Sequence, residues 1–269
     1  MIASFGPALL FCPADRPDRY AKAAQRADAL ILDLEDAVAA DAKDAARQAV
    51  ASALPTLGTQ VLVRVNAADT PWFTDDVAML RAAGHRAVML PKAASPEDLD
   101  SLDGFDVLAI CETAAGVLAA PAIARHRACT ALMWGGEDLI ADLGGRSSRD
   151  TQRRYYPVVE HARFTVLLAA AAAGKVAVDS VHIDIDDIDG LTRESGEAVD
   201  LGFGAKACIH PSHVPVIRDA FRPTDEMIAW ATGVTAAART AAGVFRYQGR
   251  MIDEPLLRQA QAVLHRTGT

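Results

Sequence analysis

Acidic side chains follow two of the short apolar runs in this chain, at spacings that would let them share a cation. Glu112 comes directly after the run Val107–Cys111, and Asp138 comes shortly after the run Ala131–Trp134. Two carboxylates without histidine or cysteine form a hard, oxygen-rich donor set that suits Mg²⁺, with water and substrate oxygens completing an octahedron. Glu137 competes with Asp138 as the second ligand, and Asp138 has the alternative role of capping a helix that begins directly after it. The best candidates for a magnesium site are therefore Glu112 and Asp138.

Two further residues close other apolar runs and have chemistry to offer. Arg64 ends one run, and its planar guanidinium needs an anionic partner, either an internal carboxylate such as Glu35 or a substrate carboxylate. His210 ends the last run before Pro211 and is a candidate base, although a histidine in this position is more often a structural hydrogen-bonding group.

The elements that must position these residues alternate regularly. Apolar runs with little polar alternation are typical of strands covered on both faces, and they occupy Ala8–Cys12, Ala29–Leu34, Val61–Val65, Ala87–Leu90, Val107–Cys111, Ala131–Trp134, Ser180–Ile185 and Ala205–Ile209. Ala-rich segments of helical composition lie between them. This alternation predicts an α/β fold, a TIM (β/α)₈ barrel over residues 1–222, whose strands carry their polar residues to one catalytic face. The competing doubly wound sheet lacks its GxGxxG fingerprint in this chain.

The last part of the chain falls outside the eight repeats. Residues 223–269 have the pattern of a long helix, a glycine-containing turn from Gly243 to Gly249 and a short last helix from Pro255. We expect this segment to form a C-terminal lid, or an arm that grips a neighbouring subunit.

Composition excludes several classes of partner. The 269 residues include 27 Lys+Arg and 35 Asp+Glu, so the formal net charge is −8, and no basic stripe is present to bind nucleic acid or an anionic membrane. The four cysteines show no paired spacing, which indicates reduced thiols. The N-terminal residues lack a basic signal-peptide region, and the apolar stretches are too short to span a bilayer. We therefore expect a soluble, cytoplasmic protein.

Eight ordered motifs connect the chain to a known family. They are LLFCPADRP (9–17), ILDLEDAV (31–38), RVN with TPW (64–66 and 70–72), MLPKA (89–93), ETAAGV (112–117), WGGEDLIADLG (134–144), LGFGAKACIHPSHVPVI (201–217) and GRMIDEPLLRQA (249–260). In their order and spacing these motifs resemble the citrate lyase β-subunit-like (CitE-like) branch of the HpcH/HpaI aldolase superfamily over essentially the whole chain.

The resemblance implies a fold, a cofactor and a reaction. It implies a (β/α)₈ barrel, usually a homotrimer, with a C-terminal segment reaching over the active site. It implies Mg²⁺ bound by Glu112 and by Asp138, the second acid of GGED, and a substrate carboxylate or keto-acid end bound by Arg64. The implied substrates are CoA thioesters of β-hydroxy acids, which are cleaved to acetyl-CoA or a homologue and a keto acid, or made in reverse as in malate synthase-like members. Asp253 of the MID motif would be the general acid/base.

The same resemblance suggests supporting residues around that centre. Glu35 and Asp36 would orient metal-bound water and Arg64 rather than bind the metal directly. The remaining candidates for substrate and CoA-phosphate binding are Pro13, Arg16, Lys22, Lys92 and His210. The first motif departs from the family, because the usual Pro-Gly-Asn is Pro13–Ala14–Asp15 here.

The sequence is compatible with three functions. The first expectation is a free-standing β-hydroxyacyl-CoA lyase of the malyl-, citramalyl- or hydroxymethylglutaryl-CoA type. The second is a citrate lyase β-subunit that acts on an acyl-carrier-protein thioester inside a complex. The third is a non-catalytic metabolite-binding barrel, which would not need the set Arg64, Glu112, Asp138 and Asp253.

Overall fold

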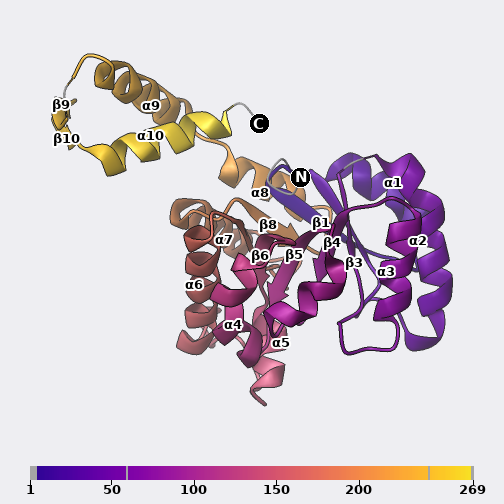
Figure 1. The fold of residues 1–269 in the computed structure, drawn as a ribbon. Coiled ribbons are helices and arrows are strands. Elements are labelled where there is room, and N and C mark those ends of the chain that lie inside the picture. The colour runs from indigo at the N-terminus through magenta and orange to yellow at the C-terminus, as the bar shows by residue number, and fades with distance from the viewer. Residues whose placement is uncertain (1–4, 59, 242, 268–269) are drawn as a thin grey trace. The chain divides into compact units, whose positions relative to one another are not determined.

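The chain divides into two compact units, Met1–Ile217 and Arg218–Thr269. The computed structural model describes residues 5–58, 60–241 and 243–267 (Figure 1). The boundary expected from the sequence, after residue 222, lies a few residues beyond the observed division. The observed division falls inside the helix His213–Phe221.

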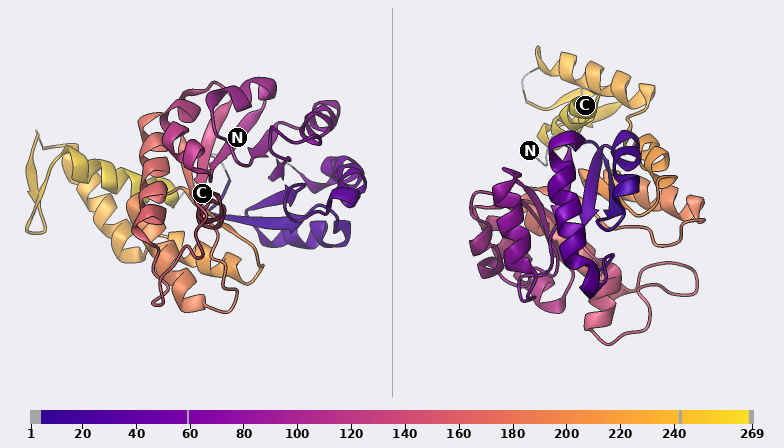
Figure 2. Two further views of the ribbon diagram at one scale, coloured as in Figure 1. Left: turned by 90° about the horizontal axis from the view of Figure 1, so that it is seen from below. Right: turned by 90° about the vertical axis from the view of Figure 1, so that its right-hand side faces the viewer.

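The first unit is a closed barrel of eight parallel strands in sequential order. Its strands are β1 (Ala8–Pro13), β2 (Ala29–Asp33), β3 (Val61–Arg64), β4 (Ala87–Leu90), β5 (Asp106–Cys111), β6 (Cys129–Trp134), β7 (Val176–Asp179) and β8 (Ala205–Cys208). Helices lie around the outside of the strands (Figure 2). The predicted (β/α)₈ barrel is confirmed, and burial of the strands on both faces explains why they are apolar runs without alternation.

One predicted strand is wrong. The sequence indicated a strand over Ser180–Ile185, whereas β7 ends at Asp179 and residues 180–187 form a connection without regular structure. That segment was predicted to be a strand as one of the apolar runs, but the side chains of Ile183 and Ile185 are exposed. The true strand, VAVD, is buried over its last three residues. Residues 180–187 therefore leave the barrel as a loop on the carboxyl-end face.

Helices follow most of the strands and begin close to their carboxyl ends. They are α1 (Pro17–Arg26), α2 (Lys43–Leu57), α3 (Phe73–Ala82), α4 (Ala114–Arg125), α5 (Gly136–Asp142), α6 (Pro157–Ala172), α7 (Ile188–Leu201) and α8 (His213–Phe221), with 3₁₀ segments η2 (Ala40–Ala42) and η3 (Pro96–Leu102). Side-chain caps fix two of these starts, because Thr113 accepts a hydrogen bond from the Gly116 N–H and Asp187 accepts one from the Gly190 N–H.

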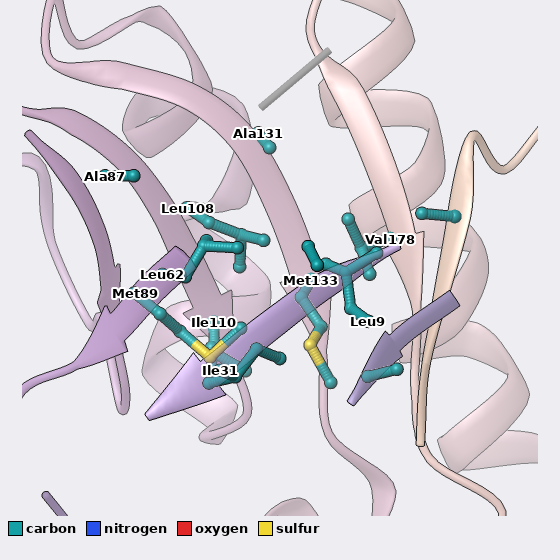
Figure 3. Packing of buried hydrophobic residues seen from close by; sticks show 13 residues of the cluster. Leu9, Ile31, Leu62, Ala87, Met89, Leu108, Ile110, Ala131, Met133 and Val178 are labelled. Carbon is teal, nitrogen blue, oxygen red and sulfur yellow. The ribbon is translucent and has the colours of Figure 1, made fainter. Parts of the chain in front are cut away.

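Side chains fill the interior of the barrel. The inward-facing set includes Ile31, Leu62, Met89, Ile110 and Met133, whose side chains point toward one another (Figure 3). A barrel packed in this way is a core rather than a channel, so the carboxyl ends of the strands are the place where a substrate binds.

The second unit has its own small core. Helices α9 (Asp225–Ala238) and α10 (Glu254–Arg266) flank an antiparallel hairpin of β9 (Phe245–Tyr247) and β10 (Arg250–Ile252). The core consists of Ala231, Val234, Ile252, Ala260 and Val263. The two expected helices are present, and the expected turn from Gly243 to Gly249 includes β9, whereas β10 follows it. Within the described ranges, no helix of either unit is long and apolar enough to cross a membrane.

Candidate active site

A cavity of about 290 Å³ opens at the carboxyl ends of the barrel strands. It is lined by Phe11, Pro13, Asp33, Asp36, Ala37, Arg64, Ile110, Glu112, Met133, Gly135, Gly136, Glu137, Asp138, Ser180, Val181 and Ile209. A larger hollow of about 390 Å³ lies in the second unit, but Arg246 is the one ionisable side chain in its described lining. Six charged side chains line the barrel cavity, and they lie at or just after the ends of β2, β3 and β5 or at the start of α5. The barrel cavity is therefore the better candidate for the active site.

Arg64 is held by two carboxylates at the end of β3. Its Nε and Nη2 donate to the two oxygens of Asp33 at 2.7 and 2.6 Å, and Asp33 is its register partner on β2. Its Nη1 lies 2.9 Å from Glu35 Oε2, and its guanidinium lies 4.9 Å from the ring centre of Phe11. Burial lowers the pKa of Arg64, but the charges of Asp33 and Glu35 outweigh it and raise the pKa above its ordinary value. The guanidinium therefore stays charged and keeps N–H groups for a ligand.

The internal partner of Arg64 was only half predicted. Glu35 was expected in this role, but Asp33 makes the bidentate contact and was missed. Asp33 also accepts a hydrogen bond from the Glu35 N–H at 2.9 Å. The signal was a single acid in the otherwise apolar run Ala29–Leu34, next to the strand that carries the arginine.

Glu112 is a buried carboxylate at the end of β5. Its Oε1 accepts the main-chain N–H of Lys92 at 2.9 Å, and only 4% of the residue is exposed. A Cβ added at Gly135 would lie 2.6 Å from Glu112 Oε2, so a glycine is needed there. Burial raises the pKa of Glu112 to about 8, the charges of Asp138 and Glu35 add to this, and Arg64 opposes it. A carboxylate kept this basic gains from a nearby cation.

Glu137 and Asp138, the two candidates for the second metal ligand, have different partners at the start of α5. Gly135 is the N-cap, which excludes the alternative that Asp138 caps this helix. Glu137 accepts a hydrogen bond from Ser148 Oγ at 2.5 Å. Asp138 lies instead 3.8 Å from Lys92 Nζ, and its charge acts on Glu112. This arrangement favours Asp138 as the partner of Glu112.

Lys92 lies among the acids rather than apart from them. Its ammonium bonds to Glu35 and lies 3.4 Å from Asp36 and 3.8 Å from Asp138. Burial lowers the pKa of Lys92, but the hydrogen bond to Glu35 and the charges of Glu35 and Asp36 outweigh it and raise the pKa. These contacts favour a role inside the acidic cluster over the expected contact with CoA phosphates.

The structure places the other candidates as follows. Pro13 lines the cavity. Arg16 bonds to Asp18 through Nε and Nη2, both at 3.0 Å, and Lys22 is exposed on α1. His210 is exposed and its Nδ1 lies 2.7 Å from Ser212 Oγ in the turn before α8. Arg16, Lys22 and His210 do not belong to the described cavity lining, and the local contact of His210 agrees with the structural alternative for it.

Asp253 lies in the second unit, where it is the N-cap of α10. Its Oδ1 accepts the Leu256 N–H at 3.3 Å. This capping role accounts for its position locally. Its role as general acid/base remains a prediction.

A buried ion network lies behind one wall of the cavity. Asp179 at the end of β7 accepts hydrogen bonds from Trp134 Nε1 at 2.8 Å, Arg163 Nε at 3.1 Å and Lys206 Nζ at 2.8 Å. Lys206 also donates to the carbonyl oxygen of Ser180, which lines the cavity, at 2.7 Å. The network therefore ties β6, α6, β7 and β8 together at the cavity wall.

A second buried acid extends this network. Glu194 of α7 bonds to Arg149, and its Oε2 lies 3.0 Å from His182 Nδ1. Burial raises the pKa of Glu194, but the hydrogen bonds with His182 and Arg149 outweigh it and lower the pKa to about 2. Glu194 is therefore ionised at all but strongly acidic pH.

The donor set fits a hard divalent cation. Glu35 Oε2 is buried and has no aligned hydrogen-bond donor in the described part of the chain, so it can accept from a water molecule on a cation. No group of three or more His, Cys, Asp or Glu side chains in the described ranges is arranged to enclose an ion. A cation here would take Glu112 and Asp138 from the chain and its other ligands from water or substrate.

Comparison with known proteins gives a consistent set of relatives. Residues 8–105 and 102–211 match the HpcH/HpaI aldolase/citrate lyase family model. A citrate lyase subunit beta-like protein of Mycobacterium tuberculosis is 47% identical over 263 residues, which cover 98% of this chain and 96% of that protein. A mitochondrial citramalyl-CoA lyase of Rattus norvegicus is 33% identical over 290 residues, which cover 96% of this chain and 84% of that protein.

The solved structures agree with the sequence relatives. The crystal structure of protein CitE from Mycobacterium tuberculosis in complex with magnesium, acetoacetate and coenzyme A has a TM-score of 0.93 to this chain and 46% sequence identity. The match covers 99% of this chain and 100% of that one. The eight ordered motifs, the closed barrel and these full-length matches together show that the chain belongs to the HpcH/HpaI aldolase/citrate lyase family.

Proposed function

We propose that this protein is a Mg²⁺-dependent carbon–carbon lyase that cleaves a β-hydroxyacyl-CoA thioester into acetyl-CoA, or a homologue, and a keto acid. The observation that carries the proposal is the grouping of Glu112, Asp138 and Arg64 around one cavity at the carboxyl ends of the barrel strands. The named activity of the citramalyl-CoA lyase relative, and the magnesium, acetoacetate and coenzyme A in the CitE complex, support the substrate class and the metal.

The chemistry assigns a task to each group. The bond between Cα and Cβ breaks, the β-hydroxyl loses its proton as its oxygen becomes the ketone, and the bonding electrons pass to Cα as a thioester enolate. Mg²⁺ bound by Glu112 and Asp138 would supply Lewis acidity toward the reacting oxygen and the adjacent carboxylate. Arg64, preorganised by Asp33, binds the carboxylate of the keto-acid part and offsets its charge.

Two proton transfers remain to be assigned. Glu35 Oε2, which lacks an aligned donor within the described residues, would position a water molecule that takes the proton of the β-hydroxyl and passes it to the Glu35 carboxylate. Asp253 protonates Cα in the cleavage direction, or removes a proton from acetyl-CoA in the synthetic direction. It would do so in its own subunit or in a neighbouring one.

A cytoplasmic homotrimer is part of this proposal, and light scattering on the purified protein tests the oligomeric state.

The alternative functions are less well supported. A citrate lyase β-subunit would need an acyl-carrier protein, whereas the citramalyl-CoA lyase relative aligns with 96% of this chain and is named for a CoA thioester. A non-catalytic barrel has no need of a Glu112 carboxyl buried beside a second acid, an arrangement that costs free energy unless a cation compensates it.

Substitution of the proposed metal ligands tests the assignment. Glu112→Ala and Asp138→Ala are expected to abolish calorimetric Mg²⁺ binding and Mg²⁺-dependent cleavage of hydroxyacyl-CoA. Glu160→Ala, which removes an exposed acid of α6, is the matched control and should bind Mg²⁺ as the wild type does. Unchanged Mg²⁺ binding in the first two variants would show that the ligands are assigned wrongly.

A further inference from the structure

Lys92 has an unusual backbone in the middle of the acidic cluster. Its φ is +50°, in the left-handed region, and it shares positive φ with only two other non-glycine residues of the described ranges, Arg153 and Gln248. This conformation is strained for a residue that carries a side chain, so its surroundings must hold it in place. In this conformation the Lys92 N–H donates to Glu112 Oε1 at 2.9 Å.

The side chain of Lys92 brings a positive charge to the same place. Its ammonium bonds to Glu35 and lies 3.8 Å from Asp138. In the part of the chain that the structure describes, Lys92 is the one cationic side chain paired with Asp138. Arg64, which lines the cavity, is paired with Asp33 and Glu35. The charge of Lys92 therefore occupies the region next to both proposed metal ligands.

We propose that Lys92 is a built-in counter-ion of the magnesium site, which holds the carboxylates together without metal and competes with the divalent cation for Asp138, so that this one residue sets the Mg²⁺ affinity. The inference rests on the proposed function, because it takes Glu112 and Asp138 as the metal ligands. Lys92 is a positioning residue in this scheme and binds neither the metal nor the reacting atoms.

The electrostatic consequence has a definite sign. A cation held by Asp138 lies within a few ångströms of the Lys92 ammonium, and two positive charges at that range repel each other strongly in a site of low dielectric constant. The Lys92 side chain is 35% exposed, so solvent and salt weaken this repulsion. Removal of the charge should therefore strengthen Mg²⁺ binding rather than weaken it, by at least about tenfold after screening.

Three variants of the full-length protein isolate this effect. Lys92→Met removes the charge and keeps a long unbranched side chain at the strained position. Lys92→Arg keeps the charge. Lys175→Met makes the same change in net charge just before β7, at the opposite end of the strands from the cavity. Isothermal titration of each metal-free protein with MgCl₂ gives the affinity without any use of catalysis.

We expect Lys92→Met to bind Mg²⁺ at least about tenfold more tightly than the wild type, and the other two variants to stay within about threefold of it. Equal or weaker binding by Lys92→Met overturns the proposal, because Lys92 would then be a support for the site rather than a competitor. If Lys92→Met does not unfold cooperatively, Lys92→Gln is titrated with MgCl₂ in its place, and binding at least about tenfold tighter than in the wild type is again expected. Absence of Mg²⁺ binding by the wild type would overturn the metal assignment itself, and this proposal with it.

Discussion

Glu112→Gln should make the metal-free protein more stable at alkaline pH, although it removes a proposed metal ligand. Glu112 has a pKa of about 8 in the folded protein, mainly because it is buried, against an ordinary value of 4.5. The folded state therefore binds this proton more tightly than the unfolded state does. The stabilisation that this tighter proton binding gives the folded protein is fully present below pH ~4.5 and is lost as the pH rises to ~8.

The size of the effect follows from the pKa difference. One pKa unit corresponds to about 1.36 kcal/mol, so a shift from 4.5 to about 8 corresponds to about 5 kcal/mol, of which about 4 kcal/mol falls between pH 5 and pH 9. A glutamine has nearly the same shape, does not titrate, and can still accept the Lys92 N–H. It should therefore escape the cost of a buried charge.

Urea unfolding in EDTA at pH 5, 7 and 9 measures this difference. We expect the variant to gain about 4 kcal/mol relative to the wild type between pH 5 and pH 9. Saturating Mg²⁺ should raise the stability of the wild type and leave the variant unchanged, since only the wild type binds the ion. A stability difference that is independent of pH, or that turns against the variant at pH 9, would refute the reasoning.

Three other substitutions test separate parts of the site. Gly135→Ala places a Cβ 2.6 Å from Glu112 Oε2, so we expect Mg²⁺ affinity measured by calorimetry to fall at least about tenfold, and an unchanged affinity would contradict this. The pKa of Glu194 is lowered to about 2, so its ionised form contributes about 3 kcal/mol to the free energy of unfolding, and this contribution is lost as the pH falls from ~4.5 to ~2. In urea unfolding, Glu194→Gln should therefore be less stable than the wild type at neutral pH, and the difference should shrink over that pH range. Asp253→Asn should keep Mg²⁺ binding and lose at least about 100-fold in turnover, and normal turnover would remove Asp253 from the mechanism.

The barrel was predictable because its strands are buried on both faces. A strand such as β2, ALILD, has all five residues buried, and this shows directly as an apolar run. The position of β7 was not predictable in the same way, because VAVD is short and the apolar residues Val181, Ile183 and Ile185 that follow it resemble a strand. Local pattern alone does not show which of two adjacent segments pairs with β6 and β8.

The candidate site was predictable where the strand end determines the position of a side chain. Glu112 and Arg64 directly follow or end their strands, and both line the cavity. Contacts between side chains from different strands were not predictable. The bidentate pair of Arg64 with Asp33 depends on the register between β2 and β3. The ammonium of Lys92 reaches Glu35 across 57 positions of sequence, a contact that needs the closed barrel.

The central claim is that the protein breaks a carbon–carbon bond in a CoA thioester with the help of Mg²⁺, and product analysis tests it most directly. Purified protein is incubated with malyl-, citramalyl- and hydroxymethylglutaryl-CoA, with Mg²⁺ or with EDTA, and the keto acid, acyl-CoA and free CoA are quantified. We predict that at least one substrate gives keto acid and acyl-CoA in equal amounts with Mg²⁺, and that EDTA stops the reaction until Mg²⁺ is restored. Release of free CoA without keto acid, or cleavage that continues in EDTA, would contradict the account.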